Sequence, residues 1–325
     1  MKPRILQTGA LSPGLDAQLA EEFDVLRLWE CDTPLAALAD SGAPVRGIAT
    51  SAPVGVPDDL LAALPDLEVI SCRGVGLDRI DLASCRARGI QVAGTFGVLS
   101  DCVADLALGL MIDAARRISE AERFVRAGRW SREKFPLATR ISGQRLGIVG
   151  LGQIGQAVAR RAAAFDMEIR YTGRMEKIGQ PWAYEDSLVE LAAWADMLVL
   201  TVSGGASTEG MVSAEVLEAL GPRGYLINVA RGSVVDEAAL LGALAGGGIA
   251  GAALDVFADE PHVPEAFLAL ENVVLLPHIG SGTKETRRDM EALVLRNLQS
   301  YFRTGAVVTP APDLGAGRVP QSLPV

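Results

Sequence analysis

Short apolar segments alternate with Ala- and Leu-rich helical segments along almost the whole chain, and this alternation constrains the fold more than any other feature. The segments that read as strands form two series: RILQTG, DVLRLW, RGIAT and EVISCRG, then RLGIVG, MEIRY, MLVLT, YLINV, AGAALDV and NVVLLP. Strands that alternate with helices form parallel sheets covered by helices. Because 325 residues are too many for one ordinary core, the sequence predicts two α/β domains, each with a doubly wound parallel sheet.

Helical patterns separate and follow the two series of strands. Residues 101–128, DCVADLALGLMIDAARRISEAERFVRAG, are predicted to form one long helix that ends at Gly128. A second helix is predicted over residues 284–303, after the last strand. The remaining segment, residues 305–325, is rich in Pro and Gly and is expected to be extended or disordered.

Composition and charge exclude several classes of protein. The formal net charge of −10 repels phosphate backbones, so no nucleic-acid partner is expected. No apolar run reaches the length of about 18–20 residues that spans a bilayer, and the first residues do not resemble a signal peptide. A cytoplasmic protein without a membrane partner is therefore expected. The cysteines form no CxxC pair and are expected to be thiols in a reducing compartment: Cys31, Cys72, Cys85 and Cys102.

The motif GLGQIG lies between the strand RLGIV and a helical segment, which is the context of a dinucleotide-binding turn. Gly150 permits the tight turn, Gly152 lets the backbone approach a pyrophosphate, and Gly155 lets helix and strand pack closely. The N–H groups at the start of the helix, around Gln153 and Ile154, are available to the pyrophosphate. The alternative is a merely structural turn, but the position between a strand and a helix favours dinucleotide binding.

The end of the next strand indicates which dinucleotide is bound. In NAD-binding folds an acidic residue about 20 residues after the turn binds the ribose 2′-hydroxyl. The nearby carboxylates fall elsewhere: Asp166, Glu168 and Glu176. Here the chain has Gly173, which leaves space, and Arg174, whose guanidinium can bind a 2′-phosphate, with Lys177 as a second cation. Arg174 could instead be an ordinary solvated residue. The missing acid favours NADP(H), with NAD(H) as the alternative cofactor.

Three later stretches carry charged or titratable residues directly after a strand: NVARGSVVDEAAL, ALDVFADEP and LLPHIGSG. Arg231, Asp255 with Glu260, and His278 should therefore gather at the carboxyl edge of one sheet, where doubly wound folds bind ligands. A lone His is more often structural, but a His beside an Arg, a Glu and a dinucleotide site is a candidate acid/base. The other histidine, His262, is expected to be a surface residue. Nothing in these stretches calls for a metal.

Over nearly its whole length the chain resembles the NAD(P)-dependent D-2-hydroxyacid dehydrogenases. The similar stretches are SCRGVGLDRIDL, GVLSDCVADLALGLM, GLGQIG, INVARGSVVDEAAL, GAALDVFADEP and NVVLLPHIGSGTKETR. Within that family, YTGRMEK and LENVVLLPHIGSGTKETR are most similar to the NADPH-preferring glyoxylate/hydroxypyruvate and hydroxyphenylpyruvate reductases. The resemblance implies a Rossmann-type dinucleotide-binding catalytic domain, residues 97–283, and a flavodoxin-like substrate domain formed by residues 1–96 and 284–325, with the active site in the cleft.

The same resemblance implies the roles of the catalytic residues. His278 would be the acid/base, Glu260 its partner, and Arg231 the ligand of the substrate carboxylate, which the backbone N–H groups of Val75 and Gly76 would also hold. The implied reaction is the reduction of a small 2-oxo acid, of the glyoxylate or hydroxypyruvate type, to the D-2-hydroxy acid. Protonated His278 would donate to the ketone oxygen as hydride arrives from NADPH.

For the cofactor, the resemblance implies that Asp255 fixes the nicotinamide amide and that Ser100 contacts the cofactor. The chain departs from the family pattern in three places. Phe96 stands where Pro is usual, Gly173 replaces a frequent Ser, and the loop TVSGGASTEG lacks the usual Pro-rich sequence against the cofactor.

Two other kinds of protein share this fold. A formate dehydrogenase needs no proton donor and has Gln where this chain has Glu260. A dinucleotide-sensing corepressor would bind without catalysis, and the acidic charge argues against it. The family pairs through the region of the long helix, so a homodimer is expected. Residues 129–143 would then cross to the partner and bring Phe135 or Leu137 to the mouth of its active site.

Overall fold

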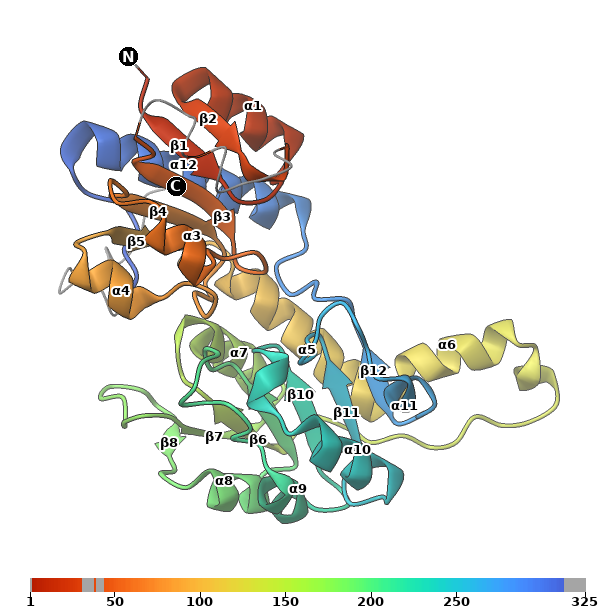
Figure 1. Cartoon of the computed structure of the whole chain (residues 1–325). Helices are drawn as coiled ribbons and strands as arrows, with labels where there is room; N and C mark the ends of the chain where they lie inside the picture. The colour runs from red at the N-terminus through yellow and green to blue at the C-terminus, as the bar shows by residue number, and fades with distance from the viewer. Residues whose placement is uncertain (1, 31–37, 39–43, 313–325) are drawn as a thin grey trace. The chain divides into compact units, whose positions relative to one another are not determined.

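The computed structural model describes residues 2–30, 38 and 44–312, and the chain divides into two compact units (Figure 1). Unit 1 comprises Met1–Leu99 and Lys284–Val325, and unit 2 comprises Ser100–Thr283. Unit 2 thus begins at Ser100, close to residue 97, where the sequence predicts the start of the catalytic domain. The strands of each unit pair in parallel into one sheet with helices on both faces, which confirms the predicted fold class.

Unit 1 contains a five-stranded sheet with the order β2-β1-β3-β4-β5, the order of flavodoxin-like folds. Its strands are β1 (Arg4–Gln7), β2 (Asp24–Arg27), β3 (Gly47–Ser51), β4 (Val69–Arg73) and β5 (Gln91–Ala93). Apolar residues of α1 (Pro13–Glu22) and α12 (Lys284–Thr304) pack on one face, and those of α3 (Asp58–Ala62) and α4 (Leu82–Ala87) pack on the other. The first series of strands and the final helix are confirmed, whereas the short edge strand β5 was missed.

The segment after α12 returns to the edge of this sheet. Pro310 forms an antiparallel bridge with Ala93, and the Ala311 N–H donates to the Val92 carbonyl at 2.8 Å. The Thr309 hydroxyl donates to the Gly94 carbonyl at 2.6 Å. Pro310 and its neighbours therefore pair with an edge strand that would otherwise offer unpaired backbone groups. The rest of the expected tail, residues 313–325, lies outside the described residues.

Unit 2 contains a seven-stranded sheet with the order β12-β11-β10-β9-β6-β7-β8, which is the Rossmann order extended by one strand. Its strands are β6 (Arg145–Val149), β7 (Glu168–Thr172), β8 (Ala183–Tyr184), β9 (Met197–Leu200), β10 (Tyr225–Asn228), β11 (Gly251–Leu254) and β12 (Val273–Leu275). The second series of strands is confirmed, and the two-residue strand β8 was missed. The chain order reverses between β6 and β9, and doubly wound folds bind ligands at the carboxyl edge beside such a reversal.

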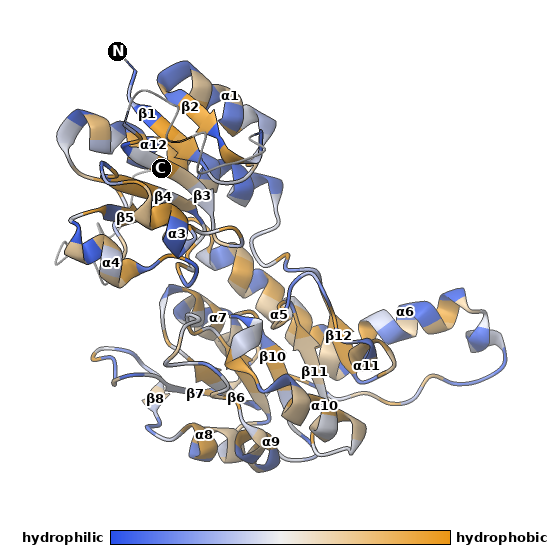
Figure 2. Ribbon diagram, viewed as in Figure 1, coloured by the Kyte–Doolittle hydropathy of each residue, from blue (hydrophilic) through white to orange (hydrophobic). Residues whose placement is uncertain are grey.

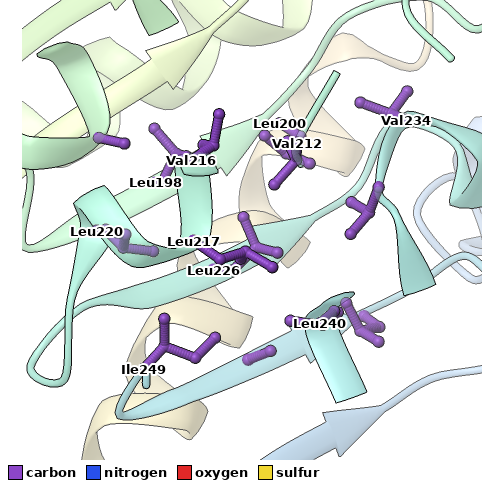
Figure 3. Close-up of a cluster of buried hydrophobic side chains, with 14 of the residues drawn as sticks. Leu198, Leu200, Val212, Val216, Leu217, Leu220, Leu226, Val234, Leu240 and Ile249 are labelled. Carbon is purple, nitrogen blue, oxygen red and sulfur yellow. The ribbon is translucent and has the colours of Figure 1, made fainter. Parts of the chain in front are cut away.

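Helices cover both faces of the sheet of unit 2. One face carries α5 (Ser100–Arg116) and α7 (Gln153–Ala163), and the other carries α8 (Leu188–Trp194), α9 (Ala214–Leu220) and α10 (Glu237–Ala245). Figure 3 shows the second contact, where Leu198, Leu200 and Leu226 of the strands meet Val216 and Leu240 of the helices, all nearly without solvent exposure. Each such side chain contributes roughly 1.5–3 kcal/mol through burial. Hydrophobic colours accordingly dominate the strands in Figure 2.

The helix predicted over residues 101–128 is interrupted, so this prediction was wrong in part. Helix α5 ends at Arg116, Arg117 adopts a left-handed backbone with φ 55°, and α6 (Ile118–Arg126) begins in a new direction. The carboxylate of Asp113 accepts hydrogen bonds from the Ser119 N–H, at 2.7 Å, and from its hydroxyl. Asp113 thus satisfies the Ser119 N–H at the start of α6, which a continuous helix would have bonded to a backbone carbonyl.

The cysteines that the structure describes are free thiols, as the sequence predicts. Cys72, Cys85 and Cys102 are thiols, and burial raises the pKa of the Cys85 thiol to about 11, so it stays protonated at neutral pH. Cys31 lies outside the described residues. No helix in the described ranges is long and apolar enough to cross a membrane.

Candidate functional site

The glycine-rich turn joins β6 to α7 at the carboxyl edge of the sheet of unit 2. The Gly150 N–H donates to the Thr172 carbonyl at the end of β7, at 2.9 Å. Gly150 has φ 96°, and a Cβ there would lie 2.7 Å from Val202 Cγ1. A Cβ on Gly155 would lie 2.2 Å from the Gly150 carbonyl oxygen. The fold itself therefore requires glycine at both positions.

Gly152 differs from the other two glycines of the turn. It caps α7 with an ordinary φ of −75°, and a Cβ added there would have no heavy atom within 4 Å among the described residues. Neither the backbone nor a neighbour accounts for the glycine, but a ligand that approaches the turn closely would. The N–H groups of Gln153 and Ile154 open the helix beside it, with the positive end of the helix dipole. These features fit the pyrophosphate of a dinucleotide.

Thr201 supports the turn, and the sequence analysis did not predict this role. It follows β9, and its hydroxyl donates to the Gly150 carbonyl at 2.5 Å. Thr201 Oγ1 would also lie 2.9 Å from a Cβ on Gly155. The Thr201 hydroxyl therefore contacts the first glycine of the turn and packs against the third. The contact joins residues that follow two different strands, and no local pattern in the sequence reveals it.

The segment that follows β7 carries the predicted cation. Gly173 and Arg174 come directly after Thr172, the residue that bonds to the Gly150 N–H. Arg174 is exposed, and a Cβ on Gly173 would have no neighbour within 4 Å in the described part of the chain. Asp166 and Glu168 lie at the opposite, amino end of β7. The first cation after the strand is thus next to the dinucleotide turn, while these two carboxylates are not.

The candidate acid/base pair lies at the same edge of the sheet. His278 Nδ1 is 2.6 Å from Glu260 Oε2, and Glu260 Oε1 accepts a hydrogen bond from the Phe257 N–H at 3.1 Å. Burial acts to raise the pKa of Glu260, but the hydrogen bond and charge of His278, with smaller effects of Phe257 and Arg231, leave that pKa below its ordinary value. Glu260 is therefore an anion at neutral pH, and its carboxylate lies against Nδ1 of the His278 ring.

Asp255 holds the backbone of the segment that carries His278. The His278 N–H donates to the Asp255 carbonyl at 2.9 Å, and the two carboxylate oxygens accept from the N–H groups of Ile279 and Gly280, both at 2.7 Å. Asp255 is 1% exposed, and this burial raises its pKa although the two N–H donors act in the opposite direction. The structure thus gives Asp255 a bracing role, and its expected contact with a nicotinamide amide stays a prediction.

Arg231 follows β10 in a loop that Asn228 holds in shape. The Asn228 side chain donates to the Arg231 carbonyl at 2.9 Å and accepts from the Ala230 N–H at 3.0 Å. A Cβ on Gly232 would lie 1.9 Å from the Phe257 carbonyl carbon, so this loop packs directly on the loop that leads to Glu260. The structure therefore brings Arg231, Glu260 and His278 to one edge of the sheet. Asn228 was missed, although an Asn at the end of a strand is a familiar signal for a side-chain-supported turn.

The remaining predicted residues lie elsewhere. Ser100 is the first residue of α5, whose first turn approaches the segment after His278: Cys102 Sγ is 3.6 Å from Thr283 Oγ1. Val75 and Gly76 belong to unit 1, in the loop after β4. His262 is 80% exposed, with Nδ1 3.6 Å from Asp259 Oδ2, and is a surface residue as expected.

Comparisons with known proteins agree with this geometry. The family described as D-isomer specific 2-hydroxyacid dehydrogenase, NAD binding domain, matches residues 108–280. A hydroxyphenylpyruvate reductase of Plectranthus scutellarioides is 44% identical over 306 residues, which are 94% of this chain and 98% of that protein. A 2-ketogluconate reductase of Gluconobacter oxydans is 44% identical over 309 residues, which are 95% of this chain and 98% of that protein.

A solved structure is similar over the same span. It is an NADPH-dependent glyoxylate/hydroxypyruvate reductase of Sinorhizobium meliloti in complex with NADP and malonate, with 45% sequence identity and a TM-score of 0.91. The similarity covers 97% of this chain and 98% of that one. The match of the family over unit 2 and these full-length relatives, together with the glycine-rich turn and the His–Glu pair, show that the chain belongs to the D-isomer specific 2-hydroxyacid dehydrogenase family.

Proposed function

We propose that the protein reduces a small 2-oxo acid of the glyoxylate or hydroxypyruvate type to the D-2-hydroxy acid with NADPH. The observation that carries this proposal is the pair of His278 and Glu260, 2.6 Å apart, at the carboxyl edge of a sheet that also holds the glycine-rich turn. An oriented imidazole beside a dinucleotide site is the arrangement that reduction of a ketone requires.

The residues of the pair and Arg231 have distinct tasks in this reaction. Arg231 binds the substrate carboxylate through its planar guanidinium, which sets the orientation of the neighbouring ketone. Glu260 accepts a hydrogen bond from the Nδ1–H group of His278, which leaves the Nε2–H group to donate a proton to the ketone oxygen. The anionic charge of Glu260 stabilises the imidazolium from which that proton comes. NADPH, when bound, supplies the hydride.

Several features support NADP(H) as the preferred cofactor. Gly152 leaves open space at the turn, and the N–H groups of Gln153 and Ile154 would bind the pyrophosphate. Arg174 would bind the 2′-phosphate, beside Gly173. The Sinorhizobium meliloti relative is NADPH-dependent and was solved with NADP. NAD(H) would lack the phosphate contact and is the weaker alternative.

The names of the relatives support the substrate class. They include reductases of hydroxyphenylpyruvate, glyoxylate or hydroxypyruvate, and 2-ketogluconate, which share a 2-oxo acid group and differ in the side chain. The relatives reported above are all reductases, so the alternative of a corepressor is not favoured. In this proposal residues 97–283 bind the cofactor and catalyse. Residues 1–96 and 284–325 bind the substrate, with the N–H groups of Val75 and Gly76 on its carboxylate, while Ser100 and Asp255 contact the cofactor.

A homodimer is part of the proposal. The segment between α6 and β6 extends away from the sheet of unit 2 (Figure 1), and a groove of about 430 Å³ lies beside it, lined in part by Arg117, Glu120 and Glu271. Apolar side chains on this arm are exposed, with Trp130 72% and Leu137 99% accessible, which a partner subunit would cover. Phe135 packs on Phe124 in its own chain, with ring centroids 5.3 Å apart, so Leu137 is the better candidate to reach the partner. A monomeric mass in sedimentation at micromolar concentration would contradict the dimer.

The thiols and the net charge of −10 support a cytoplasmic protein without a nucleic-acid partner. The main test of the proposed function is the loss of NADPH absorbance with a panel of acids: glyoxylate, hydroxypyruvate, hydroxyphenylpyruvate and 2-ketogluconate. At least one of the first two should be reduced, and chiral analysis should identify the D product where the product has a stereocentre. If NADPH binds but none of these acids is reduced, the proposed function is wrong.

A further inference from the structure

The loop that carries Arg174 is held by two tyrosine hydroxyls. Residues 173–182 join β7 to β8 at the edge of the sheet of unit 2. The Tyr184 hydroxyl donates to the Gly173 carbonyl at 3.1 Å, and the Tyr171 hydroxyl accepts from the Lys177 N–H at 2.7 Å. The backbone is thus fixed on both sides of Arg174, immediately before it and three residues after it.

The two tyrosines form a rigid support for this loop. Tyr171 and Tyr184 are register partners on β7 and β8, and their ring centroids lie 5.4 Å apart. Tyr171 is 1% exposed, and its carbonyl accepts a hydrogen bond from the Glu185 N–H at 2.8 Å. Strand β8 has only two residues, so without these contacts few interactions would fix the conformation of the loop.

The cations of the loop are available for an anion. Among the described residues, neither Arg174 nor Lys177 pairs with a carboxylate, whereas Arg145 pairs with Asp196 in the same unit. Both loop cations are exposed, and the loop starts next to the residue that bonds to the first glycine of the turn. A loop with a fixed backbone and two cations that pair with no described carboxylate is suited to binding a phosphate.

We propose that the hydroxyl groups of Tyr171 and Tyr184 are determinants of cofactor specificity, because they preset residues 173–177 for the 2′-phosphate of NADPH. The inference rests on the proposed function, in which Arg174 binds that phosphate. A loop that is ordered before binding loses less conformational entropy when the ligand arrives. It therefore binds the phosphate more tightly than the same residues would on a flexible loop. The tyrosines act as positioning residues, through the loop backbone and not through contact with the cofactor.

The support should matter for NADPH and not for NADH. NADH carries no 2′-phosphate, and the turn that binds its pyrophosphate is held by other groups. The Gly150 N–H donates to the Thr172 carbonyl, and the Thr201 hydroxyl donates to the Gly150 carbonyl. Neither contact involves a tyrosine hydroxyl, so loss of a hydroxyl should leave the pyrophosphate site intact.

The experiment measures dissociation constants of the full chain for NADPH, NADH and adenosine 2′,5′-bisphosphate by calorimetry. In Tyr184→Phe, which keeps the ring and removes one hydrogen bond, affinity for the two 2′-phosphorylated ligands should fall roughly 3- to 10-fold. Affinity for NADH should change less than about twofold, within the effect of a lost remote contact. Tyr171→Phe tests the second hydroxyl separately, and thermal unfolding checks that each variant is folded.

Tyr225→Phe is the matched control. Its hydroxyl lies 3.1 Å from Thr139 Oγ1, and Tyr225 begins β10 at the amino edge of the same sheet, opposite the turn. This variant also loses one hydroxyl contact, but its affinity for all three ligands should equal that of the wild type. A comparable loss of NADPH affinity in the control would assign the effect to the domain as a whole and overturn the proposal.

A double-mutant comparison with Arg174 shows whether the loss of a tyrosine hydroxyl acts through the phosphate-binding loop or on the domain as a whole. In an Arg174→Ala background, Tyr184→Phe should cause a clearly smaller further loss of NADPH affinity, because the main phosphate ligand of the loop is gone. Equal losses with and without Arg174, or equal losses for NADPH and NADH, overturn the inference alone. If the wild-type protein binds NADH as tightly as NADPH, the cofactor preference of the proposed function is wrong and the inference falls with it.

Discussion

His278 Nδ1 lies 2.6 Å from Glu260 Oε2, and the backbone of the same histidine adopts φ 51°, in the left-handed region. A residue other than glycine in this region costs on the order of 1 kcal/mol or more unless its surroundings impose the conformation. Here Asp255 imposes it, because its carbonyl and carboxylate bind three successive N–H groups, those of residues 278–280. One acid therefore orients the ring and a second acid holds the backbone.

Glu260→Gln should move the pH profile of reduction toward acid. Reduction needs protonated His278, and the hydrogen bond to His278 that lowers the pKa of Glu260 reciprocally stabilises the imidazolium. A neutral amide can still accept the ring N–H but does not stabilise its charge. The falling limb of kcat/KM against pH should therefore move to lower pH. The rising limb of hydroxyacid oxidation should shift in the same direction.

Glu237→Gln is the control for this substitution. Glu237 accepts a hydrogen bond from the Ala258 N–H at 2.8 Å, in the same loop, and removal of its charge should leave both limbs nearly in place. If Glu260→Gln leaves both limbs where they are in the wild type while chemistry limits the rate, Glu260 is not the functional partner of His278.

Asp255→Asn should slow turnover and destabilise unit 2. The single oxygen of the amide can accept from only one of the Ile279 and Gly280 N–H groups, and its NH2 group would face the other donor. An unsatisfied buried donor costs about 1–3 kcal/mol, so the melting temperature should fall and kcat should drop as His278 loses its fixed backbone. Asp236→Asn, at the cap of α10, keeps its acceptor for the Ala239 N–H and should change neither quantity. Wild-type kcat in Asp255→Asn would show that the brace is dispensable.

The glycines of the turn should separate binding from folding. Gly152→Ala should leave the melting temperature unchanged, because φ is ordinary and no described atom lies near the new methyl group. It should lower the affinity for NADPH about tenfold or more, since the methyl group occupies space that the pyrophosphate would use. Gly155→Ala places a Cβ 2.2 Å from the Gly150 carbonyl oxygen and should instead destabilise the fold. If Gly152→Ala binds NADPH normally, the open space at the turn is not the pyrophosphate site.

Much of the fold was predictable from the sequence because most strands are apolar runs flanked by helical periodicity. The exceptions are instructive. Strands β5 and β8 span three and two residues, too few for a pattern, and β8 exists through its pairing with β7. The break at Arg117 lacks Gly or Pro, and it depends on the side chain of Asp113 reaching Ser119. Periodicity along one helix carries no record of such a contact.

The candidate site divides in the same way. Arg231, Glu260 and His278 follow strands, so a parallel sheet must bring them to one edge, and this part was predictable. The residues that hold the site act across the sheet or on the backbone of a neighbouring loop. Thr201 reaches Gly150 from another strand, and Asn228 closes its own loop. Thr201 and Asn228 lie at the ends of strands, and only their neighbours in the structure show that they support the site.

Arg174→Asp should reverse the cofactor preference. The guanidinium–phosphate bond is charge-assisted and exposed to solvent, so it should contribute roughly 1.5–3 kcal/mol, or about 10- to 100-fold in affinity for NADPH. The introduced carboxylate would repel the 2′-phosphate and accept a hydrogen bond from the ribose hydroxyl of NADH. Gly173 leaves the space that the shorter side chain and the ribose need, because no described atom lies within 4 Å of its added Cβ.

Steady-state kinetics with both cofactors, at one concentration of glyoxylate or hydroxypyruvate, measure this reversal. Arg160→Asp is the control: Arg160 is an exposed residue of α7 in the same unit, and the substitution makes the same change in net charge. A general electrostatic effect would impair the use of NADPH in both variants. If Arg174 binds the 2′-phosphate, the preference for NADPH over NADH should reverse in Arg174→Asp alone. Raising the salt concentration should narrow the difference between NADPH and NADH in the wild type, since the contact is exposed and therefore screened. Equal use of NADPH and NADH by the wild-type protein would show that the cation after β7 does not select the cofactor.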